Sequence, residues 1–298
     1  MTAWLAALPQ QVANGVLLGA VYSLFALGYA LIFGVLDILN LAHGAIFMAG
    51  AVVALELVTV LGWPLLLALV GASVVGGCLG LLLDHIAFWP LRLRQATYLS
   101  PLISSIAMAL ILENVALTQF GPDQQRFPAS IFPDQSVAVG GATITTLQLV
   151  MVAVAAVLTG GLWLMLRRAR LGLAIRAVAA NPRAAHLVGI DVERTIAISF
   201  FIASALGAAA GVLFGLNFAV SWEMGANIQL RGLAVIILGG MGSIPGTVLA
   251  GVLLGLAEEL GVSVFPSSLR DVVSFGLLFL ILIVRPAGLL GQRGLRAA

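Results

Sequence analysis

The residues that could do chemistry are few and lie far apart in this chain. Its three histidines, His43, His85 and His186, fall in separate regions, and Cys78 is the only cysteine. The sequence holds neither a His-Glu-x-x-His pair nor a Gly-x-Ser-x-Gly elbow, the patterns of zinc peptidases and serine hydrolases. All 14 basic residues are arginines, so the lysine of a phosphate-binding P-loop is missing. The sequence therefore predicts no catalytic residue, no metal site and no cofactor or nucleotide bound by this chain.

Polar residues within long apolar stretches are better candidates for functional residues. If such a stretch lies in a membrane, a charge in the middle of the bilayer costs a few kcal/mol and is kept for a reason. Asn40 and His43 lie together in a glycine-flanked break, and the chain turns apolar again directly after Glu113 and Asn114. A structural hydrogen bond and a role on a polar pathway both stay open for His43. The other ionisable residues lie near the ends of apolar runs, where water or lipid headgroups explain them: Asp37, Glu56, Glu223, Glu258 and Glu259.

The elements that must position these residues follow from the composition. The chain has 298 residues, of which 61% are apolar and only 9% are charged, whereas soluble domains carry roughly 25% charged residues. Eight stretches contain no Asp, Glu or Arg: 1–36, 38–55, 57–83, 95–112, 135–166, 195–222, 232–257 and 272–284. A membrane-spanning helix needs ~20 apolar residues, and these stretches lack the alternation of barrel strands. We expect an all-α integral membrane protein, a polytopic helical bundle of about eight membrane segments.

Arginine density orients the bundle, because short cytoplasmic loops are enriched in basic residues. Arg92 and Arg94, the six arginines between 167 and 194, and Arg285, Arg293 and Arg296 mark cytoplasmic regions, whereas the loop 121–141 falls outside. Three simple crossings between residue 194 and the carboxyl terminus would place two arginine-rich regions on opposite sides. One run is therefore broken or re-entrant.

The best candidate for this break is 232–257, because it contains the helix-breaking sequence from Gly239 to Gly246. An earlier break at 37–44 makes two broken segments and hints at an internal repeat. Broken helices often form transporter substrate sites. We therefore expect Asn40, His43, Gly242 and Ser243, with Glu113 and Asn114, to line a translocation pathway.

Glycines spaced four residues apart predict close helix packing. Such pairs or triplets occur at Gly15 and Gly19, Gly76 and Gly80, Gly251 and Gly255, and Gly207, Gly211 and Gly215. Packing within this chain is the simpler interpretation. The alternative is that one face, 207–215, packs against a second subunit.

The polar segment 167–194 is the most informative part of a chain that otherwise forms a single transmembrane domain over 1–298. It reads as two short helices, 172–180 and 182–188, with Asn181 capping Pro182 at the first helical position and Gly189 ending the turn. Two interpretations remain, a helix lying on the membrane surface and a docking knob for another protein.

Several segments together resemble the permeases of bacterial branched-chain amino-acid ATP-binding cassette (ABC) transporters, of the type of the first leucine/isoleucine/valine permease subunit. These segments are 172–191, Asn14-Gly15, 34–50, Glu113-Asn114, 239–246 and 285–291. By this resemblance, the ATPase-coupling residues are Gly172, Arg176, Asn181, Arg183, Ala184, Gly189 and Asp191.

The resemblance implies a multi-pass subunit of the bacterial inner membrane that works with several partners. These are a second homologous permease, two cytoplasmic ATPase subunits that bind ATP and Mg, and an extracytoplasmic solute-binding protein; nucleic acid is not among them. Three alternatives stay open. They are an ion-coupled secondary carrier that uses Glu56, Glu113 or His43, an ABC permease for urea or amides, and an assembly subunit with no pathway of its own.

Overall fold

A computed structural model describes residues 2–97, 99–131, 135–139, 141–264, 266 and 269–291. Arg293 and Arg296, which the orientation argument used, lie outside these residues. The helices are α1 (Thr2–Leu36), α2 (His43–Thr59), α3 (Leu65–Leu83), α4 (Trp89–Leu93), α5 (Leu99–Phe120), α6 (Thr146–Arg168), α7 (Arg170–Ala180), α8 (Pro182–Leu187), α9 (Val192–Asn217), α10 (Met224–Gly239), α11 (Ile244–Val264) and α12 (Arg270–Val284). A π-helical turn η1 (Asp84–Phe88), a 3₁₀ turn η2 (Ala129–Ile131) and the strands β1 (Ser136–Val139) and β2 (Ala142–Thr145) complete the described elements.

The helices confirm an all-α, multi-pass membrane protein. Within the described residues, six helical segments are long and apolar enough to cross a bilayer: Leu8–Leu36, Leu65–Leu93, Leu99–Phe120, Thr146–Arg168, Val192–Asn217 and Ile244–Val264. Two further apolar helices, α2 and α10, are shorter. The count of about eight membrane segments stays a prediction, because no membrane boundary fixes how far the short helices reach.

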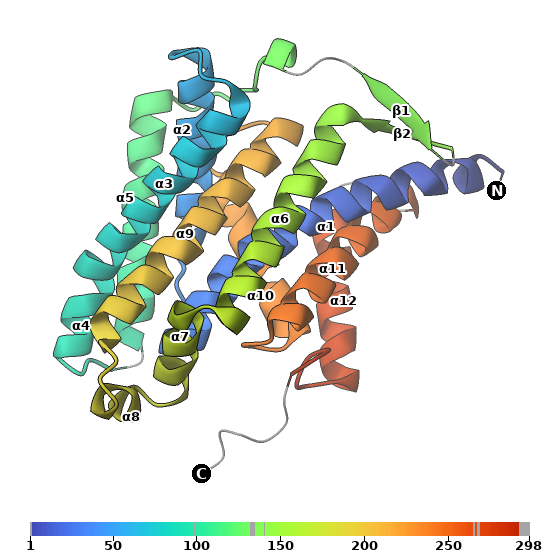
Figure 1. Cartoon of the computed structure of the whole chain (residues 1–298). Coiled ribbons are helices and arrows are strands. Elements are labelled where there is room, and N and C mark those ends of the chain that lie inside the picture. Colours follow the sequence, from blue (N-terminus) through green and yellow to red (C-terminus); the bar gives the residue numbers. More distant parts are fainter. Residues whose placement is uncertain are drawn as a thin grey trace.

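The arginine-rich regions gather at one end of the bundle. Figure 1 shows α4, α7, α8 and the described residues that follow α12, 285–291, at the lower end, with the hairpin of β1 and β2 at the opposite end. The hairpin is antiparallel, with Ser136 opposite Thr145. The charge-free stretch 135–166 is therefore a hairpin followed by α6, which begins at a capping box of Thr145 and Gln148.

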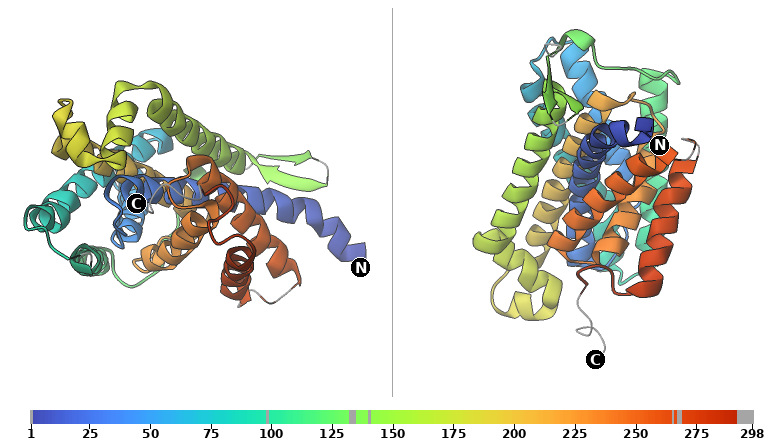
Figure 2. Two further views of the ribbon diagram at one scale, coloured as in Figure 1. Left: turned by 90° about the horizontal axis from the view of Figure 1, so that it is seen from below. Right: turned by 90° about the vertical axis from the view of Figure 1, so that its right-hand side faces the viewer.

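Two long helices, α1 and α9, form the centre of the bundle. Helix α1 packs mainly against α11 and also against α9, and α9 packs mainly against α3 and α2. Figure 2 shows that α1 lies between the other helices and that its amino-terminal end extends past the bundle. Most side chains of the apolar parts of α1 and α9 are buried, whereas most of those on α5 and α6 are not.

The glycines spaced four residues apart lie at contacts between helices, as predicted. A Cβ on Gly19 would overlap the backbone of Val252 in α11, and one on Gly76 would overlap Ala208 in α9. The alternative for 207–215, a face against a second subunit, is wrong. Gly207 packs against His43, Gly211 against the Phe47 backbone, and Gly215 against Val220. All three contacts lie within this chain.

The chain leaves the helical path twice in the same way. Six residues, 37–42, link α1 to α2, and six residues, 218–223, link α9 to α10. In both cases a long helix is followed by a short link and then by a short helix. The structure therefore supports a repeat, but the counterpart of the break at 37–44 is 218–223 and not 239–246.

The run 232–257 is broken within 239–246, as the helix-breaking sequence predicted. Helix α10 ends at Gly239 and α11 begins at Ile244, so the stretch 232–257 belongs to two helices. The Leu289 N–H donates to the Leu238 carbonyl at 2.7 Å, and Gly240 packs against Gly291. The turn therefore lies beside residues 285–291, where Gly240 and Gly291 let the two backbones meet.

Candidate translocation and coupling sites

His43 fills a space at the centre of the bundle that two glycines leave open. A Cβ on Gly28 of α1 or on Gly207 of α9 would meet its imidazole ring. The ring packs against Phe25 and Tyr29, with centroid distances of 4.8 and 5.7 Å, and Nε2 lies 3.3 Å from the Phe25 carbonyl oxygen. His43 has no exposed surface. This histidine is therefore held on several sides by α1 and α9.

At and just before the start of α2, backbone N–H groups donate hydrogen bonds to side-chain oxygens. The Gly44 N–H donates to Gln229 Oε1 of α10 at 2.7 Å, and the Ala42 N–H donates to Asn40 Oδ1 at 3.1 Å. The Leu41 N–H donates to Ser105 Oγ of α5 at 3.1 Å. The Gly44 bond satisfies one of the N–H groups that a helix start cannot satisfy internally, and the other two hold the link just before α2. Sequence reasoning missed Gln229, whose partner is 185 residues away.

Three polar side-chain atoms at this junction lack a partner among the described residues. They are Asn40 Nδ2, His43 Nδ1 and Gln229 Nε2. Asn40 is only 1% exposed. Asn40 and His43 therefore lie in a polar junction where α2 and α10 begin, and their place on a translocation pathway stays a prediction.

Glu113 and Asn114 lie elsewhere, on α5. Asn114 is exposed, and its Nδ2 donates to the Leu110 carbonyl of the same helix at 2.8 Å. Glu113 is half-buried and lies within electrostatic range of Glu223, the residue before α10. These two residues therefore form a polar patch on α5, separate from His43.

Gly242 and Ser243 form the turn before α11. Gly240 and Gly242 have φ angles of 93° and 88°, a region that glycine adopts without strain. Ser243 Oγ accepts a hydrogen bond from the Gly246 N–H at 3.2 Å, so Ser243 caps the helix start. Gly242 is exposed at this end of the bundle.

A cavity of about 540 Å³ joins this turn to the segment 167–194. Gly242 lines one side and Arg176 of α7 the other, so one pathway candidate and one coupling candidate face the same space. The walls are aliphatic side chains of α1, α6 and α7, among them Leu31, Leu166 and Ile175. Cavities of this size and polarity suit small apolar ligands with one polar group.

The segment 167–194 folds as predicted, into α7 and α8. Asn181 Oδ1 accepts from the Ala184 N–H at 3.0 Å, Pro182 is the first residue of α8, and Gly189 follows with a φ of 85°. Asp191 Oδ1 then accepts from the Arg194 N–H at 3.0 Å at the start of α9. Local capping chemistry therefore fixes both helices.

Two further coupling candidates lie at the ends of this segment. Gly172 packs against the backbone of Met165 and Leu166, which lets α7 fold back on α6. Arg183 is exposed on α8. Beside it, Leu187 and Val188 are 86% and 76% exposed. These two apolar residues do not belong to the apolar helices that could lie in the bilayer. The tip of α8 therefore presents an apolar and basic surface.

A charged network that the sequence did not reveal ties α10 to α11, α12 and α1. Glu258 of α11 is completely buried. It accepts hydrogen bonds from Tyr22 Oη at 2.8 Å and Ser274 Oγ at 2.5 Å, and Arg231 Nε lies 3.4 Å from its Oε1. Arg231 also pairs with Asp271 at 2.8 Å. The expectation that Glu258 contacts headgroups or water is therefore wrong, because protein groups satisfy this carboxylate.

A second ion cluster fastens the start of α9. Arg92 of α4 pairs with Asp84 at 2.6 Å and with Glu193 at 2.8 Å. Asp84 is buried in the π-helical turn η1. Because Glu193 lies near the end of the segment 167–194, this cluster joins that segment to the π-helical turn η1 that follows α3.

The fold first defines the class of protein: a multi-pass helical membrane protein with a knob, formed by α7 and α8, at its arginine-rich end. The chain matches the family described as "Branched-chain amino acid transport system / permease component" over residues 11–282. It is 38% identical to the high-affinity branched-chain amino acid transport system permease protein LivH of Escherichia coli K12, and the match covers 95% of both chains. It is 35% identical to BraD of Pseudomonas aeruginosa, a permease of the same description, again over 95% of both chains.

A more distant relative comes from Methanocaldococcus jannaschii. This probable branched-chain amino acid transport permease protein is 30% identical, with 90% of this chain and 88% of the relative covered. The chain therefore belongs to the branched-chain amino-acid transport permease family, a family of ABC transporter permeases, as the sequence motifs had indicated.

Proposed function

We propose that this chain is the membrane-spanning permease subunit of a binding-protein-dependent importer in the bacterial inner membrane. It passes branched-chain or related aliphatic amino acids inward. Two partner ATPase subunits hold ATP and Mg, a second homologous permease completes the membrane part, and an extracytoplasmic binding protein delivers the solute. The permeases named above support the solute class, because their descriptions specify branched-chain amino acids.

The observation that carries this proposal is the exposed tip of α8. Leu187 and Val188 expose most of their surface on the knob, between the helix caps of Asn181 and Asp191. An exposed apolar patch rimmed by polar residues is typical of a protein interaction site. Because the sequence has no P-loop lysine, the energy for transport comes from a partner that binds this knob.

The proposed pathway combines residues from three separate places in the structure. Glu113 and Asn114 provide the polar surface on α5, and Gly242 and Ser243 form the turn beside the cavity that Arg176 lines. Asn40 and His43 act in its wall by fixing the start of α2. A zwitterion with an aliphatic side chain suits a route with hydrogen-bonding groups and apolar walls.

The test is reconstitution of the chain with its genomic partner subunits. Val188→Asp is expected to abolish co-purification of the ATPase subunits and ATP-driven leucine uptake into proteoliposomes. The matched control is Val137→Asp, an exposed valine on β1 at the opposite end, which is expected to leave ATPase co-purification unchanged. Retention of the ATPase subunits by Val188→Asp would contradict the proposal.

The alternatives give different results in the same system. Uptake by the purified chain alone under an imposed proton gradient, with loss on Glu113→Gln, would favour an ion-coupled carrier. Uptake of urea or acetamide in preference to leucine would favour an amide permease. Unchanged uptake after bulky replacements at Gly242 and Ser243 would favour an assembly subunit.

A further inference from the structure

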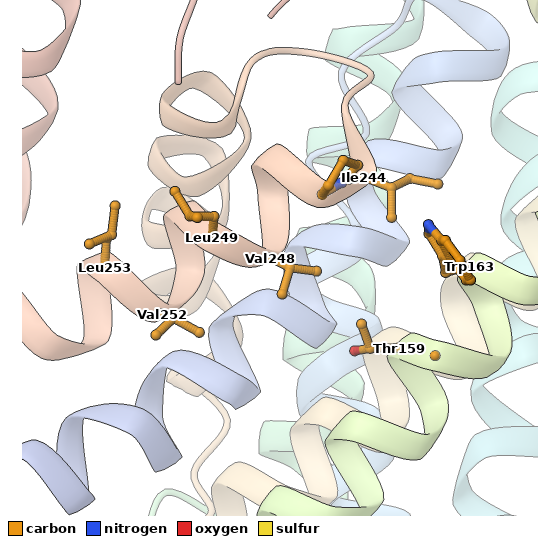
Figure 3. Close-up of a pocket in the computed structure, with 9 residues that line it drawn as sticks. Thr159, Trp163, Ile244, Val248, Leu249, Val252 and Leu253 are labelled. Atoms are coloured by element: carbon orange, nitrogen blue, oxygen red, sulfur yellow. The ribbon is translucent and has the colours of Figure 1, made fainter. Parts of the chain in front are cut away.

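A second hollow runs along the outside of the bundle between α6 and α11. Its volume is about 560 Å³, and it is lined by Thr159, Gly160 and Trp163 of α6 and, from α11, by Ile244, Pro245, Val248, Leu249, Val252 and Leu253. Figure 3 shows Trp163 and Ile244 at one end of this groove and Leu253 at the other. Thr159 is the only lining residue with a polar side-chain oxygen, so the groove suits a hydrocarbon chain.

The groove exists because two helices pack on a third without filling the space between them. Both α6 and α11 contact α1, but they make few contacts with each other. Gly160 adds to the opening, since no atom outside its own helix lies within 4 Å of a Cβ built there. The α11 residues lie on one helix face from Ile244 to Leu253, a length of about 13 Å. A stretch of lipid acyl chain fits such a groove.

Positive charge stands at one end of the groove. The Arg167 guanidinium lies over the Trp163 ring, 4.7 Å from its centroid, and Arg168 follows at the end of α6. Among the residues that the structure describes, neither arginine pairs with a carboxylate. Tryptophan is enriched at the membrane interface, and basic residues beside it attract anionic headgroups. The basic end therefore lies at headgroup level and the apolar end inside the bilayer.

We propose that the groove is a binding site for an anionic phospholipid. One acyl chain lies along the α11 face beside Gly160, and the phosphate headgroup lies at Arg167 and Arg168. An apolar groove alone would accept any lipid, whereas the two unpaired arginines favour a negatively charged headgroup. The proposal does not depend on transport or on the partner subunits, because it concerns lipid contact with this chain alone.

The experiment uses the fluorescence of Trp163 as the probe. The full chain is placed in lipid nanodiscs that contain phosphatidylglycerol or phosphatidylcholine with brominated acyl chains at equal mole fraction. Bromine quenches tryptophan only on contact, and the difference from a Trp163→Phe chain isolates this residue from the other tryptophans. We expect phosphatidylglycerol to bind on the order of tenfold more strongly than phosphatidylcholine. High salt should lower this preference in the unmodified chain.

Variants separate the two parts of the site. Replacing both arginines, as Arg167→Gln with Arg168→Gln, is expected to remove the preference for phosphatidylglycerol but to keep quenching. Gly160→Leu is expected to reduce quenching by both lipids, because the leucine occupies the groove. Arg94→Gln is the charge control. Gly276→Leu is the matched glycine control, since Gly276 on α12 also has open space at its Cβ.

Two results would overturn the proposal. Equal quenching by both lipids in the unmodified chain would mean that the groove holds bulk lipid without selection of the headgroup. Absence of Trp163 quenching by either lipid would mean that protein, such as a second subunit or copy, covers the groove.

Discussion

Gly44 and Gly225, the second residues of α2 and α10, meet through their backbones. A Cβ built on either residue would overlap the carbonyl oxygen of the other. The two short helices therefore begin at one point in the interior, next to the bond between Gly44 and Gln229. Because each helix start carries a partial positive charge, this point combines two positive ends with polar side chains. Only glycine permits this approach.

The first prediction concerns this contact. Gly225→Ala should destabilise the fold by about 1–3 kcal/mol, because backbone atoms cannot move aside as a flexible side chain would. Thermal unfolding in detergent measures the change. Gly276→Ala is the control, since its site is open, and it should be neutral or stabilising because alanine favours helix. Unfolding of Gly225→Ala at the temperature of the unmodified chain would contradict the close contact.

The second prediction concerns the buried carboxylate of Glu258. Glu258→Ala should cost about 3–5 kcal/mol, because it leaves Arg231 without its buried partner and Ser274 without an acceptor. Asp271→Asn removes a charge from the same network, but Asp271 is 67% exposed. That pair is worth at most about 1 kcal/mol. Denaturation of the two variants side by side measures the difference, and similar losses would refute a distinct buried role for Glu258.

The third prediction tests the helix cap in the segment 167–194. Asn181→Ala should destabilise the start of α8 by about 1 kcal/mol, since Asn181 Oδ1 accepts the Ala184 N–H. ATP hydrolysis by the assembled complex should then respond less to solute-loaded binding protein. Asn181→Asp keeps an acceptor at the cap and should restore the response. If Asn181→Ala left the response of ATP hydrolysis unchanged, the cap would have no part in coupling.

Local signals made the helices of the segment 167–194 predictable from the sequence. Asn181, Pro182 and Gly189 act on backbone groups only a few residues away, so the expected helices 172–180 and 182–188 differ from α7 and α8 by at most two residues. The four-residue spacing of glycines predicted the close helix contacts equally well. Glycines at this spacing share one helix face, so the spacing indicates a packing face without identifying the helix that packs there. The membrane class followed from the absence of charge over long stretches.

Contacts between distant parts of the chain were not predictable in the same way. The link at 218–223 was missed because Phe218, Ala219 and Val220 continue the charge-free stretch 195–222. Glu258 was assigned to the membrane surface because its partner Tyr22 is 236 residues away. One sequence contains no signal that pairs these residues. The same limit hid Gln229, which acts on a helix start in the other half.

The last prediction asks whether the cavity between Gly242 and Arg176 lies on the route of the solute. Gly34 of α1 lines this cavity, and no atom lies within 4 Å of a Cβ built there. Gly34→Leu therefore occupies the cavity without displacing a neighbour, so the unfolding temperature should stay the same or rise. If the solute passes here, uptake by the assembled importer should fall several-fold while the ATPase subunits remain bound. Gly276→Leu, which adds the same side chain to open space on α12, should leave uptake unchanged. Normal uptake by a stable Gly34→Leu chain would exclude the cavity from the pathway and leave the α5 patch at Glu113 and Asn114 as the remaining candidate.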